Sequence, residues 1–202
     1  MICRVAVTGG FGSGKSTVCA FLEEEGYPVI STDRVARELL HGNESIRRQV
    51  IQTFGATIIG EDGDIDRSKL AARVFANPDE LQRLEDILHP PTLEAVDAMI
   101  SELSGRPPVV FIESALIFET GIEELFDFII AVVADTEQIL ERYLGKGGMT
   151  QEEILRRIET QMPAIEKASR ADFVIRNNGS LKQLRENTYI ILTILKAMCE
   201  GS

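Results

Sequence analysis

The chain contains the segment Gly9-Gly10-Phe11-Gly12-Ser13-Gly14-Lys15-Ser16, which matches the phosphate-binding pattern G-x-x-x-x-G-K-[ST]. The segment follows the apolar run Ile2–Val7 and precedes a stretch of helical period that includes Val18, Phe21 and Leu22. This order of strand, glycine-rich loop and helix is the context in which the pattern binds nucleotide phosphates. A glycine-rich turn without a ligand is the alternative interpretation, and the flanking elements argue against it.

Each part of this loop has an expected role. Glycines let successive backbone amides converge on a phosphate, and the following helix adds the positive end of its dipole. Lys15 is expected to reach the β- and γ-phosphates of ATP and to act in catalysis, and the Ser16 hydroxyl is expected to ligate Mg²⁺. The candidate nucleotide-binding residues of the loop are Gly10, Gly12, Ser13, Gly14, Lys15, Ser16 and Thr17.

Outward from the loop, short apolar runs alternate with longer segments of helical period. This alternation is typical of βα units around a parallel sheet, so we predict an α/β fold. The five expected strands are Ile2–Val7, Pro28–Ser31, Val109–Glu113, Asp127–Val133 and Asp172–Ile175.

Two regions are longer than the connections of such a sheet require. Residues from about 34 to 108 contain several helix-like patterns and are interpreted as an inserted substrate-binding region. Residues from about 137 to 170 are expected to form two helices around the glycines that flank Lys146, with Thr150 and Glu153 as a capping box at the start of the second. Such a pair of helices is suited to act as a mobile lid.

A last helix is expected from Leu181 to Cys199. It is predicted to pack on the sheet through the apolar stripe Leu184, Ile191, Leu195 and Met198. The whole chain, residues 1–202, is then expected to be one domain, with its core at about 1–33, 109–136 and 171–202.

The composition limits the classes of partner. With a net charge of -11 and no Lys/Arg-rich run, the chain is expected to bind no nucleic acid and no anionic membrane. A small anion such as ATP remains compatible with this charge, because a few amides, one lysine and a metal ion reverse the field locally. We therefore expect a small-molecule substrate and no obligatory protein partner.

The cysteines are Cys3, Cys19 and Cys199. Their odd number and the lack of a CxxC or Cys/His ligand spacing argue against a disulfide framework and against a zinc site, so we expect three thiols. No run of residues approaches the ~20 apolar positions of a membrane span. The expected location is the cytoplasm.

Three acidic residues lie at or after expected strand ends. Asp33 follows the second strand, where a carboxylate could accept the proton of an acceptor hydroxyl; equally, it could be the N-cap of the next helix. Glu113 ends the third strand and is interpreted as a residue of the metal site. Glu119 is either a polar group of the ligand crevice or a solvated loop acid.

Cations concentrate in the expected lid, at Arg142, Lys146, Arg156 and Arg157. They suit closure over a polyphosphate, although neighbouring glutamates make some of them candidates for ion pairs on a wet helix. His89 precedes two prolines and is interpreted as a held polar group of the insert, or as a structural histidine.

Taken together, these residues resemble the dephospho-CoA kinase family over nearly the whole chain. The matching residues are Thr8 to Gly10, Gly12 to Thr17, Asp33 with Ala36-Arg37, Phe75 to Pro78, His89-Pro90, Leu116 to Glu119, Arg142, Arg157 with Gln161, and Asn177-Asn178-Gly179. The loop at residues 9–16 is common to many families, whereas the ordered set is specific.

The resemblance implies a P-loop NTPase three-layer sandwich that transfers the γ-phosphate of ATP to the 3′-hydroxyl of dephospho-CoA. It implies that Asp33 is the base and Arg142 a catalytic lid cation, and that Asn177 lies near the adenine. The implied substrate-binding residues are Asp33, Arg37, His89, Glu119 and Arg157.

The chain departs from the family pattern at two places. Ser114-Ala115 precedes Leu116 where the family has proline, which predicts a less rigid backbone. Lys146-Gly147 replaces an Arg-Asp pair, and lysine lacks the bidentate geometry of arginine.

Two other functions remain open on the residues alone. Another P-loop kinase of a small metabolite would share every ATP-side residue and differ in its acceptor. A nucleotide-dependent switch protein would need no acceptor, and Asp33 with the long insert argues against it.

Overall fold

The computed structural model describes residues 2–74, 76–103 and 108–200, with only the backbone of Lys146 and Glu200. It forms two compact units, the first made of Met1–Ser31 with Leu103–Ser202 and the second of Thr32–Glu102. Each unit has its own hydrophobic core.

The first unit is built on a parallel sheet of five strands in the order β2-β3-β1-β4-β5. The strands are β1 (Cys3–Thr8), β2 (Val29–Ser31), β3 (Val109–Glu113), β4 (Phe128–Val133) and β5 (Phe173–Arg176). All five predicted strands are confirmed to within one residue at each end. The apolar runs were a reliable signal because both faces of the central strands β1, β3 and β4 are largely buried.

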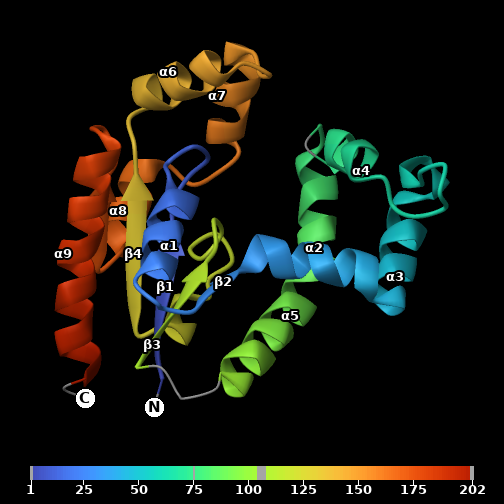
Figure 1. The fold of residues 1–202 in the computed structure, drawn as a ribbon. Helices are drawn as coiled ribbons and strands as arrows, with labels where there is room; N and C mark the ends of the chain where they lie inside the picture. The colour runs from blue at the N-terminus through green and yellow to red at the C-terminus, as the bar shows by residue number, and fades with distance from the viewer. Residues whose placement is uncertain (1, 75, 104–107, 201–202) are drawn as a thin grey trace. The chain divides into compact units, whose positions relative to one another are not determined.

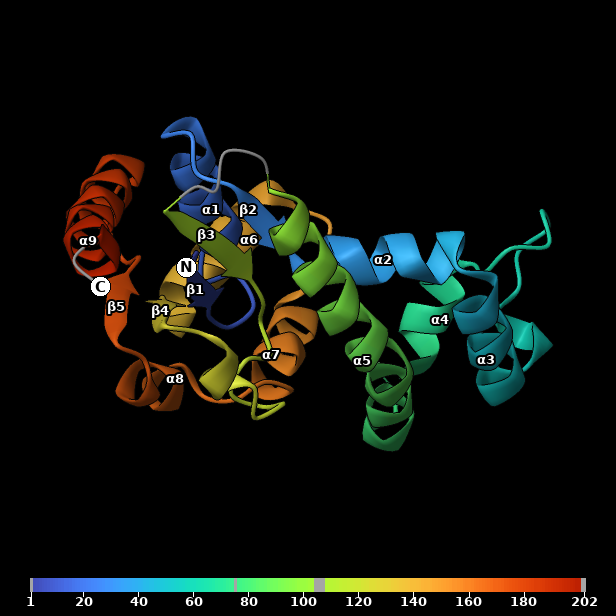
Figure 2. The same ribbon diagram turned by 90° about the horizontal axis from the view of Figure 1, so that it is seen from below.

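Helices cover both faces of this sheet, as Figure 2 shows, with α1 and α9 on one face and α8 on the other. Val5 and Val7 of β1 pack in the cluster of α1 and α9, whereas Ala6 packs with Ile117 and Phe118 on the opposite face. This alternation follows from the two-residue period of a strand. The predicted three-layer α/β architecture is therefore confirmed.

In the first unit, helices lie between strands β1 and β2 and between β4 and β5, and α9 follows the last strand (Figure 1). They are α1 (Lys15–Glu24), α6 (Thr136–Lys146), α7 (Gln151–Glu159), α8 (Ala164–Arg170) and α9 (Leu181–Glu200), with a short 3₁₀ turn at Glu123–Leu125. The described helices include none long and apolar enough to cross a bilayer.

Local signals placed two of these helices well. The capping box at α7 is confirmed, since Thr150 Oγ1 accepts from Glu153 N at 3.3 Å and Glu153 Oε2 accepts from Thr150 N at 2.7 Å. In α9, Leu184 and Leu195 are buried as predicted, but Met198 is exposed, and Leu192 is buried in its place. The prediction was wrong at Met198 because the buried face of α9 passes through Leu192 and Leu195, and Met198 lies outside this face.

The second unit is helical. It consists of α2 (Thr32–Gly42), α3 (Glu44–Phe54), a 3₁₀ turn at Ala56–Ile58, α4 (Arg67–Val74) and α5 (Pro78–Glu102). Its core includes Leu40, Val50 and Phe54. Helix α5 continues through Pro90 and Pro91, so the two prolines after His89 do not end it.

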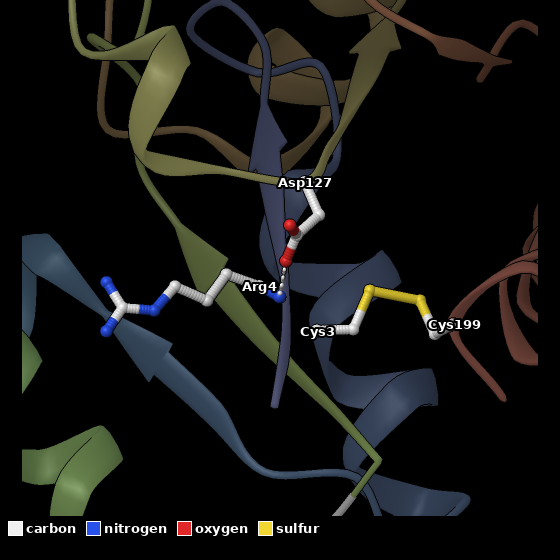
Figure 3. The surroundings of a disulfide bond; sticks show 4 residues. All are labelled: Cys3, Arg4, Asp127 and Cys199. Atoms are coloured by element: carbon white, nitrogen blue, oxygen red, sulfur yellow. Dashed lines mark hydrogen bonds between the residues drawn. A yellow bond between two sulfur atoms is a disulfide. The ribbon is translucent and has the colours of Figure 1, made fainter. Parts of the chain in front are cut away.

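Cys3 and Cys199 form a disulfide bond, which Figure 3 shows beside the hydrogen bond from the Arg4 backbone N–H to Asp127. Their Cα atoms are 5.8 Å apart although 196 positions separate them in the chain. The expectation of three thiols was therefore wrong, because the pairing depends on the packing of α9 beside β1. Cys19 is a free cysteine, and its burial raises the pKa of its thiol.

Reduction of this disulfide is expected to lower the free energy of unfolding by about 2–5 kcal/mol, because the bond closes a loop of nearly the whole chain. Urea unfolding with and without dithiothreitol measures the change. Cys199→Ser should be less stable than the wild type and insensitive to dithiothreitol, whereas Cys19→Ala should keep the response. An oxidised wild type whose unfolding midpoint does not move on reduction would contradict this expectation.

Candidate functional site

The predicted phosphate-binding loop joins β1 to α1 in the first unit. Gly14 caps α1 in the left-handed region, with φ of 98°, and a Cβ atom there would lie 2.3 Å from Asn177 Nδ2. Only glycine fits both conditions. Lys15 Nζ donates to the carbonyls of Gly9 at 2.8 Å and Gly10 at 3.4 Å, so the ammonium lies against the loop.

A cavity of about 330 Å³ opens on this loop. Its lining contains the predicted loop residues together with two residues from distant elements, Arg142 of α6 and Asn177 after β5. Tyr143, Gly179, Leu181 and Leu184 complete it. The structure thus brings together the residues that sequence analysis assigned to the nucleotide.

The two predicted metal-site residues are in direct contact. Ser16 Oγ at the start of α1 donates to Glu113 Oε1 at 2.7 Å. Glu113 ends β3, where it lies opposite Val7 of β1 and Ser31 of β2. A hydroxyl and a carboxylate beside a phosphate-binding loop are oxygen ligands of the kind Mg²⁺ prefers.

Asn177 braces the loop from the other side. The side-chain Nδ2 of Asn177 donates to Ser13 O at 2.8 Å, and the backbone carbonyl of Asn177 accepts from Arg142 Nη2 at 2.7 Å. Arg142 Nη2 also lies 3.3 Å from Asn177 Oδ1. This buried amide therefore links the loop backbone to the guanidinium at the rim of the cavity.

Phe11, at the tip of the loop, contacts the segment that was predicted to form a lid. The Arg157 guanidinium lies 5.3 Å from its ring centroid, the Tyr143 ring lies 4.8 Å from it, and its backbone N–H donates to Gln161 Oε1 at 2.7 Å. Arg157 thus lies over the phosphate-binding loop.

Glu119 has two partners within the protein. Its Oε1 accepts from Lys167 Nζ at 2.6 Å and from Met162 N at 3.0 Å. Lys167 is fully buried, and this burial lowers the pKa of its ammonium while the hydrogen bond and charge of Glu119 act in the opposite direction. Sequence analysis missed Lys167, because nothing local distinguishes it from an exposed lysine and its partner is 48 positions away.

In the second unit, Asp33 and Arg37 line a pocket of about 360 Å³. Helix α2 begins at Thr32, so Asp33 lies in its first turn and not at its N-cap. Arg67 and a set of apolar residues complete the lining: Ala36, Leu40, Leu70, Ala71, Val74, Leu81, Leu84 and Leu88. This pocket combines apolar walls with a carboxylate and two guanidinium groups.

His89 does not belong to that lining. It lies within α5, where partial burial lowers the pKa of its imidazole. Phe75 and the side chain of Lys146 lie outside the described part of the chain.

Comparison with known proteins identifies the family of the chain. The family model for dephospho-CoA kinase matches residues 3–183. A dephospho-CoA kinase of Carboxydothermus hydrogenoformans is 41% identical over 193 residues, which are 95% of this chain and 92% of the relative.

Two solved structures are similar over the whole fold. The structure of TT1252 from Thermus thermophilus has a TM-score of 0.81 at 34% identity and covers 96% of this chain and 98% of its own. A dephospho-CoA kinase from Campylobacter jejuni has a TM-score of 0.69 at 25% identity and covers 100% and 99%. With the phosphate-binding loop, the Ser16–Glu113 contact and the matched family model, these likenesses show that the chain belongs to the dephospho-CoA kinase family of ATP-dependent kinases.

Proposed function

We propose that this protein transfers the γ-phosphate of ATP to the 3′-hydroxyl of dephospho-CoA, giving coenzyme A and ADP. The observation that carries the proposal is the cavity on the phosphate-binding loop, where the loop amides, Lys15, Arg142 and Asn177 meet. Phosphoryl transfer needs mainly positioning and charge stabilisation, and these groups supply both.

On the ATP side, the loop amides and the N-terminus of α1 bind the phosphates, and Lys15 leaves its carbonyl contacts to reach the transferring group. Arg142 adds a second cation at the rim of the cavity. Asn177 acts through its contacts with Ser13 and Arg142, which orient the loop and the guanidinium.

Ser16 and Glu113 are the proposed residues of a Mg²⁺ site. Their oxygens are already in contact, and Glu113 either binds the ion directly or holds its water shell. When bound with ATP, Mg²⁺ neutralises charge that develops on the phosphates.

The second unit is the proposed acceptor site. Its pocket suits dephospho-CoA, because apolar walls fit the aliphatic arm of that molecule while Arg37 and Arg67 fit its phosphates. Asp33 lines this pocket and is proposed as the base for the acceptor hydroxyl. It is two residues after Ser31, the residue of β2 that pairs with Glu113 of β3. His89 and Arg157 remain proposed substrate contacts from the second unit and from the lid.

This proposal includes the predicted organisation of insert and lid, a cytoplasmic location and no nucleic-acid, membrane or obligatory protein partner. The net charge of -11, which repels polyanions, supports the partner assignment. Disulfides are uncommon in the cytosol, so the reduction experiment above also tests whether the fold persists under the conditions of that compartment.

The deciding experiment is an assay of ADP release by the purified protein with Mg-ATP, with and without dephospho-CoA. Acceptor-dependent turnover, and a product one phosphate heavier by mass, are the expected results. Chelation of Mg²⁺ with EDTA should stop the turnover, and excess Mg²⁺ should restore it. Binding of ATP without stimulation by dephospho-CoA would contradict the proposed acceptor and direct the assay to other small-metabolite hydroxyls.

A further inference from the structure

Lys167 of α8 carries an ammonium that is fully enclosed by protein. Its Nζ donates to the carbonyl of Ala115 at 2.5 Å and to Glu119 Oε1 at 2.6 Å. Both acceptors lie in the connection that follows β3, the strand that ends at Glu113. A buried charge is costly unless it is paired and hydrogen bonded, so this arrangement holds α8 firmly to that connection.

The pair also holds the segment between α7 and α8. Glu119 Oε1 accepts from Met162 N at 3.0 Å, which fixes the backbone of this segment one residue after Gln161. Gln161 Oε1 in turn accepts from Phe11 N at 2.7 Å. Hydrogen bonds on either side of the Gln161–Met162 peptide bond therefore link Lys167 and Glu119 to a backbone amide of the phosphate-binding loop.

This line reaches the loop where its geometry matters most. The amides of a phosphate-binding loop must converge on the phosphates, and their directions depend on the backbone at Phe11 and its neighbours. The Ala115 carbonyl that binds Lys167 also lies 3.4 Å from Thr8 Oγ1, on the residue that ends β1 before the loop. The two acceptors of Lys167, Ala115 and Glu119, are thus linked to the two sides of this region: Ala115 to Thr8 before the loop, and Glu119 through Met162 and Gln161 to Phe11 within it.

We propose that Lys167 and Glu119 are positioning residues for ATP, which act through Gln161 to set the backbone of the phosphate-binding loop. The proposal rests on the ATP site proposed above and assigns Glu119 to the loop in place of the acceptor. It places no new group in contact with the reacting atoms.

The chain offers a matched control for this proposal. Arg170 of α8 forms an ion pair with Glu123 and lies 4.7 Å from the Phe118 ring centroid, so it joins the same helix to the same connection. Unlike Lys167, its side chain is 38% exposed, and its described contacts do not include Glu119. Its Nη1 lies 4.0 Å from Met162 Sδ, so it touches the Met162 side chain and not the backbone N–H that Glu119 holds. Removing the Arg170–Glu123 pair therefore tests whether weaker attachment of α8 alone changes the affinity for ATP.

The experiment compares Gln161→Ala, Lys167→Met and Arg170→Gln by calorimetric Kd for Mg-ATP, by the KM of each substrate, and by thermal unfolding. Gln161→Ala is expected to raise the Kd for ATP about five- to tenfold, the usual contribution of one hydrogen bond, with Tm lowered by no more than about 4 °C and the KM for dephospho-CoA unchanged. Lys167→Met should raise the Kd by a similar factor and lower Tm by about 10 °C, since a buried partner is left unpaired. Arg170→Gln should leave the Kd unchanged.

The double variant Gln161→Ala/Lys167→Met tests whether the two residues act on one line. Its Kd for ATP should rise no further than that of Lys167→Met alone, because interactions in series are not additive. If Lys167→Met does not fold, Glu119→Gln takes its place in the same comparison.

Three results would overturn the proposal: an unchanged Kd in Gln161→Ala, an unchanged Kd in folded Lys167→Met, or additive effects in the double variant. Each of them is separable from failure of the proposed function. The ATP measurements need no acceptor, whereas the proposed function fails only if the wild type does not phosphorylate dephospho-CoA.

Discussion

Replacement of Asp33 by Asn is expected to lower kcat by about 10²–10⁴, the range that a positioned general base contributes. The amide keeps the shape of the side chain but cannot accept the proton of the acceptor hydroxyl. Binding of Mg-ATP should be unchanged, because the phosphate-binding loop belongs to the first unit and Asp33 to the second. Steady-state turnover with dephospho-CoA, together with calorimetric binding of ATP, measures both quantities.

Asp79→Asn is the matched control for this variant. Asp79 lies in the first turn of α5, as Asp33 lies in the first turn of α2, and both helices belong to the second unit. Each substitution removes a favourable charge near a helix N-terminus, which contributes about 0.3–1 kcal/mol to stability. Only Asp33→Asn should lose turnover, and a near-normal kcat in that variant would remove Asp33 from the mechanism.

Lys15→Met is expected to lower kcat by about 10²–10³, the scale of one lost charge-stabilising donor. The ammonium is the one loop cation in the lining of the cavity, and methionine keeps much of its length without the charge. The protein should remain folded, because the Lys15 side chain is only partly buried and its described hydrogen bonds go to two carbonyls of its own loop. Single-turnover phosphoryl transfer, with unfolding followed in parallel, measures the effect.

Lys182→Met provides the comparison for charge alone. Lys182 is at the start of α9, between Leu181 and the other residues that line the same cavity, but its side chain is 84% exposed and pairs with Glu186. This variant should keep full activity. Equal losses in the two variants would mean that general positive charge near the cavity, and not contact of Lys15 with the phosphates, promotes transfer.

Features that depend on a few consecutive residues were predictable from the sequence. The strands are apolar because both faces of the sheet are covered, and the capping box at Thr150 and Glu153 closes within four residues. The phosphate-binding loop is equally local. Gly14 supplies the left-handed backbone conformation that caps α1, and the adjacent Lys15 supplies the cation. The family followed from the order of such local motifs along the chain.

Contacts between distant segments were decided by the tertiary structure. Asn177 meets Ser13 across 164 positions, Gln161 meets Phe11 across 150, and Cys3 meets Cys199 across 196. Whether such residues meet depends on strand order and on the row of α9 that faces the sheet, and neither is encoded in the residues next to them. Sequence by itself determined the phosphate-binding pattern of residues 9–16 and the α/β class. The buried Lys167–Glu119 pair and the brace at Asn177 exist only because packing removes water from groups that are far apart in the chain.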